Sequence, residues 1–115
     1  MGLQIRSPEA QIHTLQHAHS GAVASKTPVV IGSRVLIPLH AADALATAAY
    51  VYRAEISGGP KASGAIALNA PVYWDASAGN FTATSSGNTL CGHAIQAMGA
   101  GDTTTGLIAF NAYAA

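Results

Sequence analysis

The stretch PVYWDASAGNFTAT, residues 71–84, holds three of the seven aromatic residues of the chain, with turn-forming residues between them. Pro71 lacks a backbone N–H and therefore belongs at the start of a strand or on a sheet edge. Asp75 and Gly79 predict a turn, because an aspartate carboxylate accepts a backbone N–H two residues further on and glycine readily adopts positive φ. The stretch therefore predicts a β-hairpin in which Phe81 begins the return strand.

The same hairpin is open to a structural and a functional interpretation. Tyr73 and Trp74 are a candidate stacking platform for a ligand. A place in the core or in a subunit interface is favoured for them, because a single Trp buries about 150–250 Å². For Asp75 the turn is favoured over catalysis, because no histidine or second carboxylate stands near it in the sequence. The structural or interface candidates are Tyr73, Trp74, Asp75, Gly79 and Phe81.

Charged residues are few and unevenly distributed. They make up 9% of the chain, against about 25% in ordinary soluble domains, and the formal net charge is zero. From Ala76 to Ala115 the only charged residue is Asp102. So long a stretch cannot lie wholly inside one small domain, so part of it forms an uncharged outer surface, and such surfaces are often contact surfaces. The composition indicates a protein that works inside an assembly.

Composition also argues against several classes of partner. A neutral chain without a basic cluster has no electrostatic footprint for nucleic acid. The longest uncharged run is interrupted by Ser, Thr, Asn and Gly, so we expect no membrane span, and the first ten residues lack the apolar core of a signal peptide. Cys91 has no second cysteine to pair with and is interpreted as a small buried residue. We expect synthesis in a reducing cytoplasm.

Short windows with strand-forming composition recur along the chain, with turn-forming residues between them. We expect strands at 2–5, 11–18, 28–31, 34–39, 48–56, 65–74, 80–84, 89–98 and 105–113. The third and fourth flank Gly32-Ser33 and predict a second hairpin. Within 48–56, alternation predicts Tyr50, Tyr52, Ala54 and Ile56 on one face.

These strands predict an all-β fold, a small antiparallel β-barrel or sandwich with short hairpins and at most one short helix. A chain of 115 residues supports one domain. We expect residues 1–19 to form an N-terminal arm or the first strands, and residues 20–115 to form the single β domain.

Three histidines in HTLQHAH, His13, His17 and His19, fall on one face of an expected strand. They are weak candidates for a metal site, because spacing alone is little evidence and no cysteine or carboxylate stands nearby, so ordinary polar histidines are favoured. Neither a nucleophile elbow nor a phosphate-binding loop occurs in the sequence. We therefore expect no catalytic residues and no cofactor.

Three segments in order, PVVIGS (28–33), APVYWDASAGNFTATSSGNTLCGHAIQA (70–97) and GDTTTGLIAF (101–110), resemble a family of small tailed-phage head proteins, the capsid cement or decoration proteins. This family was long of unknown function and is often labelled a RecA/RadA-like recombinase, a label that the missing phosphate loop contradicts. The resemblance covers roughly residues 20–110, and residues 1–19 match the family's usual opening poorly. Its recurring positions are Val72, Tyr73, Trp74, Asp75, Gly79, Gly87, Asn88, Gly92, Gly101 and Asp102.

The resemblance implies a barrel-, tulip- or jelly-roll-like β fold without cofactor or catalysis. It also implies oligomers, with a homotrimer favoured over a dimer, that bridge major capsid proteins on the outer capsid surface and stabilise the shell. The virion is then the location, after assembly in the cytoplasm of the bacterial host. Two alternatives stay open: a glycan- or receptor-binding module of the phage head or tail that uses Tyr73 and Trp74, and, least favoured, a metal-dependent enzyme that uses the three histidines.

Overall fold

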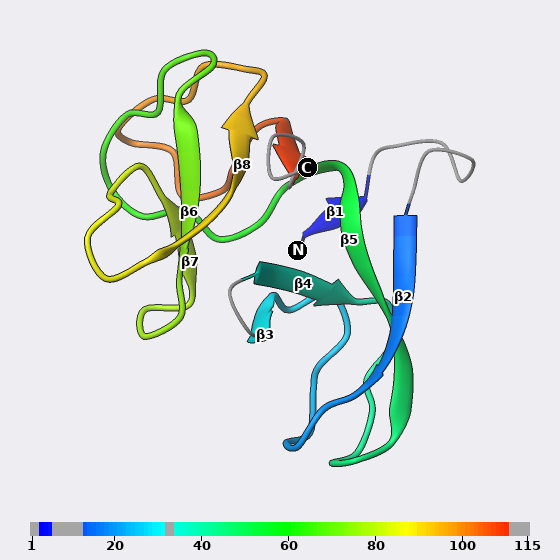
Figure 1. Cartoon of the computed structure of the whole chain (residues 1–115). Coiled ribbons are helices and arrows are strands. Elements are labelled where there is room, and N and C mark those ends of the chain that lie inside the picture. Colours follow the sequence, from blue (N-terminus) through cyan, green and yellow to red (C-terminus); the bar gives the residue numbers. More distant parts are fainter. Residues whose placement is uncertain (1–2, 6–12, 32–33, 111–115) are drawn as a thin grey trace.

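The computed structural model describes residues 3–5, 13–31 and 34–110, and in this part of the chain it contains strands and no helix. All the described strand pairs are antiparallel, and the strands join into one sheet that curls into a half-barrel, as Figure 1 shows. The strands are β1 (Gln4–Ile5), β2 (His13–Ala18), β3 (Val29–Ile31), β4 (Arg34–Pro38), β5 (Thr47–Ser57), β6 (Pro71–Asp75), β7 (Asn80–Thr82), β8 (Thr89–Ala94) and β9 (Ile108–Phe110). The expected all-β class is confirmed.

The long strand β5 connects the two halves of the sheet. Its first half pairs with β2 and β4, and its second half pairs with β1 and β9. The sheet continues from β9 through β8 and β6 to β7. Figure 1 shows β2, β3 and β4 around the first half of β5, which we call the β2–β5 lobe (residues 13–53). The loops and strands of residues 58–107 form the other part, called here the charge-poor lobe.

One apolar core serves both lobes. Its buried members come from β4 to β9 and from three positions outside the strands: Leu3, Val35, Ile37, Val51, Ala54, Ile56, Ile66, Val72, Trp74, Phe81, Cys91, Ala94, Met98, Ile108 and Phe110. Because strands of both lobes contribute to a single cluster, the lobes pack as one unit. No described helix is long and apolar enough to cross a membrane.

Both hairpins expected from the sequence are present. β3 pairs with β4 from Val29↔Leu36 to Ile31↔Arg34, and their connecting residues 32–33 lie outside the described part of the chain. β4 ends at Pro38, as expected for a residue that cannot donate to a ladder. β6 pairs with β7 from Tyr73↔Thr82 to Asp75↔Asn80. The expected division between residues 1–19 and 20–115 stays a prediction, although β1 and β2 both pair with β5.

Several expected strands are shorter than their composition suggested. The window 65–74 becomes a strand only from Pro71, because Ile66 forms an isolated bridge with Met98 and a turn follows it. The window 89–98 ends as a strand at Ala94, and 105–113 begins one only at Ile108, with residues 111–113 outside the described part.

The alternation expected along β5 is wrong in its first half. Opposite β2 the register skips a residue, because His13 pairs with Arg53 while Thr14 pairs with Val51, which leaves Tyr52 as the extra residue of a β-bulge. A bulge reverses which side chains face the core. Val51 therefore belongs to the core with Ala54 and Ile56, and the two tyrosines lie outside the core cluster.

A second bulge lies in β8. Val72 pairs with Gly92 and Tyr73 pairs with Leu90, so one residue of β8 has no partner on β6. Gly92 has φ +155°, and a Cβ at this position would collide with the backbone carbonyl oxygen of Ala109 on β9. Glycine is therefore required where β8 approaches β9 this closely.

Candidate contact surface

The hairpin of β6 and β7 uses Asp75 to build its turn. Asp75 Oδ1 accepts hydrogen bonds from the backbone N–H of Ser77 at 3.1 Å and of Ala78 at 3.0 Å, and from the Ser77 hydroxyl at 2.8 Å. The N–H of Gly79 donates to the Asp75 carbonyl at 2.7 Å, and Gly79 has φ +72°. The bond from Ala78 and that from the Ser77 hydroxyl are the main causes that hold the pKa of Asp75 below its usual value. The carboxylate is thus engaged within the turn.

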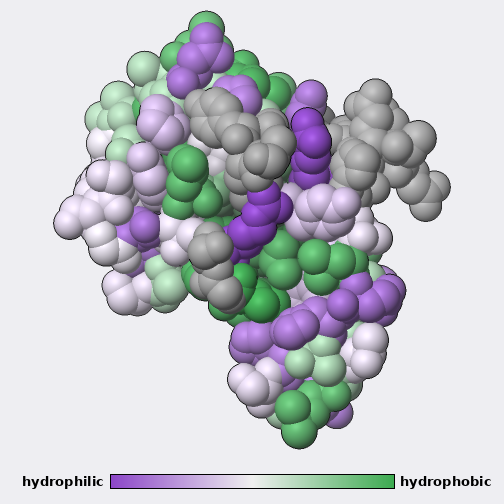
Figure 2. Space-filling model, in the orientation of Figure 1, coloured by the Kyte–Doolittle hydropathy of each residue, from purple (hydrophilic) through white to green (hydrophobic). Residues whose placement is uncertain are grey.

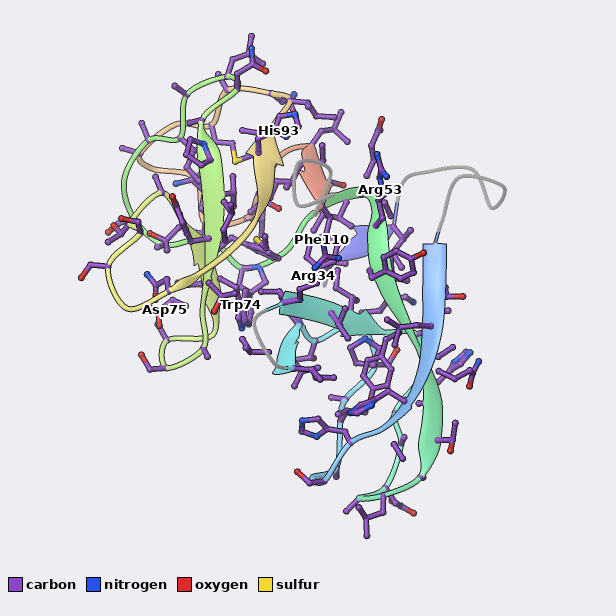
Figure 3. The ribbon with its side chains drawn as sticks, viewed as in Figure 1. Arg34, Arg53, Trp74, Asp75, His93 and Phe110 are labelled. Atoms are coloured by element: carbon purple, nitrogen blue, oxygen red, sulfur yellow. The ribbon has the colours of Figure 1, made fainter. Side chains whose placement is uncertain are left out.

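Trp74 is a core residue and not an open stacking surface. It is 4% exposed, and its ring packs edge-on against Phe81, with 4.8 Å between the ring centroids. Figure 3 shows Trp74 directed from β6 toward β4, and Asp75 on the other side of the strand. Tyr73, one position earlier on β6, is half-buried and lies on the opposite face, so the two rings do not form one platform for a sugar.

Phe81 depends on a glycine that the sequence analysis did not single out. A Cβ built on Gly59 would lie 2.6 Å from Cε2 of the fully buried Phe81 ring. The absence of a side chain at this position lets the loop after β5 close over the ring. The sequence gives little indication of this role, because a Gly58-Gly59 pair is typical of an ordinary loop.

The histidines do not gather as an evident metal site. His13 begins β2, and the register shift follows it directly. His19 lies after the end of β2, and its Nδ1 lies 3.1 Å from the backbone N–H of Gly21. The His17 ring packs edge-on against Tyr50, at 5.8 Å between centroids. Among the residues whose side chains are described, no three His, Cys, Asp or Glu side chains could together hold a metal ion.

The charge-poor lobe presents an almost uncharged surface. Its exposed residues are mainly Ala, Gly, Ser and Thr, joined by two exposed leucines, Leu68 (58% exposed) and Leu90 (40%). Its two acidic side chains both accept backbone N–H groups: Asp75 as described, and Asp102, whose Oδ2 accepts the N–H of Gly99 at 2.8 Å. Figure 2 shows this lobe mostly in the pale colours of intermediate hydropathy.

The lysine of this lobe is buried. Lys61 is 7% exposed, and its Nζ donates to the carbonyl oxygens of Ala62 at 2.9 Å, Gly64 at 2.6 Å and Asp102 at 3.4 Å. Its positive charge therefore serves mainly its own loop, 61–64, and reaches the loop 99–105 only through the long contact with Asp102, instead of facing solvent. The sequence analysis did not single out Lys61.

One comparison with known proteins finds a match. A family model described as phage cement protein matches residues 8–110. The chain belongs to the phage cement protein family. No curated protein and no solved structure matches it. Membership identifies a structural phage protein associated with the capsid.

The phage cement protein match begins earlier than the resemblance expected from the sequence, at residue 8 instead of about residue 20. The matched range includes β2, which pairs with β5 along its whole length and is therefore part of the sheet of this chain. Of the recurring family positions, Gly79, Gly87 and Gly92 all have positive φ. These glycines serve the fold of the cement protein by permitting its turns and bulge.

Proposed function

We propose that this phage cement protein binds the outer surface of the capsid as a homo-oligomer, bridges neighbouring major capsid proteins and stabilises the shell. The observation that carries the proposal is the charge-poor lobe, whose ionic groups are engaged within the lobe itself. The cores of protein interfaces are depleted of charged residues, which makes this lobe the best candidate for burial against a capsid protein. The role is structural, and it requires neither a cofactor nor catalytic residues.

The side chains of this surface suit repeated, individually weak contacts. Ala, Gly, Ser and Thr lose little side-chain entropy when they are covered, so their burial costs less than the burial of long charged side chains. Leu68 and Leu90 supply apolar area among them. A symmetric oligomer, with a homotrimer favoured, contacts several capsid subunits at once, and avidity multiplies such contacts.

Capsid stabilisation then follows from mass action. A protein that binds the assembled shell more tightly than its dissociated subunits shifts the equilibrium toward the shell, by an amount that grows with the concentration of the protein. The shell should therefore melt at a higher temperature in the presence of the cement protein, and the shift should saturate when its sites are filled.

The test mixes the purified protein with capsid shells that lack it, and measures both co-sedimentation and the melting temperature of the shell. We expect saturable binding and a raised shell melting temperature. The variant Leu90→Glu places a charge in the charge-poor lobe and should weaken binding at least tenfold, since burial of an unpaired charge costs several kcal/mol (about 1.4 kcal/mol per factor of ten). Gln16→Glu, which adds the same charge on the exposed face of β2, is the matched control. Absence of co-sedimentation at saturating protein would contradict the proposal.

A further inference from the structure

A second apolar face lies in the β2–β5 lobe, on the side of the sheet opposite the core. It encloses a groove of about 460 Å³, the second-face groove, lined by Leu15, His17, Ile31, Arg34, Leu36 and Tyr52. This volume lies within the roughly 300–1,000 Å³ of pockets that bury a whole small ligand. The groove is thus large enough to take several residues of a partner.

The groove follows from the strand pattern. On β4, Val35 and Ile37 belong to the core, and Leu36 between them points to the other face. The bulge of β5 turns Tyr52 toward the same face, where Leu15 of β2 is 37% exposed. Figure 2 shows hydrophobic side chains over β3 and β4 with hydrophilic side chains beside them. Arg34 and His17 make one part of the lining cationic or hydrogen-bond donating.

A strained leucine projects from the loop between β4 and β5. Leu45 is 72% exposed and has φ +66°, a conformation that costs a bulky residue free energy and that asparagine or glycine adopts more readily. Such strain is typical of sites where the exposed side chain has a task. Asp43, also exposed, lies two residues earlier in the same turn.

This turn, residues 43–46, is tied by backbone hydrogen bonds to the segment after β2 and within itself. The Leu45 N–H donates to the His19 carbonyl at 2.7 Å, and the Ala46 N–H donates to the Asp43 carbonyl at 3.0 Å. Just before the turn, Ala42 forms a two-bond bridge with Val23. Figure 1 places the loop between β4 and β5 at the far end of the β2–β5 lobe. A rigid projecting turn keeps the ordering cost of binding small.

We propose that the turn 43–46 of one copy inserts Leu45 into the second-face groove of a second copy. The two surfaces are complementary in chemistry: Leu45 meets an apolar lining, and the Asp43 carboxylate faces the end that holds Arg34 and His17. The contact deepens the proposed function, on which it rests, by naming the surfaces through which copies of the cement protein join.

The contact is heterologous, because the turn and the groove are different parts of the surface. Each copy donates one turn and accepts another, so the contact repeats around a ring when the rotation closes. An isologous dimer would require the same patch on both copies. This difference makes the inference testable by mixing variants.

The experiment measures self-association of the full chain by analytical ultracentrifugation and native mass spectrometry. Leu45→Gly removes the inserted side chain and relieves the positive φ, so we expect a higher melting temperature together with a dissociation constant at least about tenfold larger. Leu15→Glu places a carboxylate in the groove, where it repels Asp43, and should weaken self-association to a similar degree. Asp43→Lys, a change at an exposed residue, is expected to act in the same direction.

Mixing gives the decisive result. Leu45→Gly keeps an intact groove and Leu15→Glu keeps an intact turn, so the two variants should form a one-to-one heterodimer although each alone is monomeric. Leu68→Ser, a change at another exposed leucine, should leave self-association unchanged. A wild-type chain that is monomeric at millimolar concentration, or Leu45→Gly that associates like wild type, overturns the inference.

The same variants separate this inference from the proposed function. Monomeric Leu45→Gly should still bind shells through its charge-poor lobe, with lower avidity than wild type. Shell binding by a wild-type protein that does not self-associate would overturn only the inference about the turn and the groove. If Leu15→Glu keeps its self-association but loses shell binding, the groove accepts a capsid segment and the inference is wrong.

Discussion

Replacement of Lys61 by methionine tests whether a buried ammonium group stabilises the loop 61–64 of the charge-poor lobe. Methionine keeps most of the length and apolar character of the stem, so the change removes mainly the charge and its hydrogen bonds. The three acceptors, the carbonyl oxygens of Ala62, Gly64 and Asp102, would lose their shared donor. Two of these carbonyls belong to the loop that contains Lys61, and the third belongs to a loop 41 residues further along the chain.

The magnitude follows from the three distances. The bonds at 2.6 and 2.9 Å are short, whereas the one at 3.4 Å lies beyond the usual range of about 2.7–3.2 Å and contributes little. Hydrogen bonds to a charged group contribute about 1.5–3 kcal/mol each, so two of them amount to roughly 3–6 kcal/mol. Removal of the ammonium also ends the cost of its desolvation, so we expect a net loss of about 2–4 kcal/mol. At about 4 °C per kcal/mol, the melting temperature falls by roughly 8–16 °C.

The assay is thermal and urea unfolding followed by circular dichroism, with hydrogen exchange to locate the effect. Exchange should accelerate first in residues 62–64, whose carbonyl oxygens accept the two short bonds of Lys61, and less in residues 99–105, which only the 3.4 Å contact reaches. Lys26→Met is the matched control, since the ammonium of Lys26 has no hydrogen-bond partner among the described residues, and it should change stability by less than about 0.5 kcal/mol. A Lys61→Met protein as stable as this control would refute the reasoning.

Three further outcomes are expected. Trp74→Ala should lower the free energy of unfolding by about 3–5 kcal/mol in urea titrations, because it empties a core site beside Phe81. Gly92→Ala should lower the same free energy by about 2–4 kcal/mol, because its Cβ meets the carbonyl oxygen of Ala109. Burial raises the pKa of the Cys91 thiol, so the folded chain should react poorly with a thiol reagent at pH 8. When denaturant is added at this pH, the labelling rate should equal the rate at which the chain unfolds.

The hairpin of β6 and β7 was predictable because its determinants are local. Asp75 and Gly79 lie in the turn that they build, and the strands on both sides consist of good strand formers. The residue that Phe81 faces across the hairpin does not follow from composition, because composition does not set the register. The register, which pairs Trp74 with Phe81, decides this, and it depends on the length of the turn.

Features that depend on distant parts of the chain were not predictable. The composition near Lys61 suggests an exposed loop, and nothing there indicates that Asp102 supplies one of its acceptors. The bulge at Tyr52 is set by pairing with β2, so the alternation along β5 alone gave the wrong face for both tyrosines. The second-face groove escaped the sequence analysis for the same reason.

The positions of the few charged groups help to explain why the chain has so few. In the charge-poor lobe, the ammonium of Lys61 and the carboxylates of Asp75 and Asp102 all serve turns or loops of the lobe itself. Such a surface gives little electrostatic repulsion between copies, which for a free protein favours precipitation. Under the proposed function the same property is an advantage, because a capsid surface that covers the lobe desolvates few charged groups, and the two carboxylates keep their hydrogen bonds within the lobe. The unusual composition therefore supports the proposed function, in which neighbouring proteins cover this lobe.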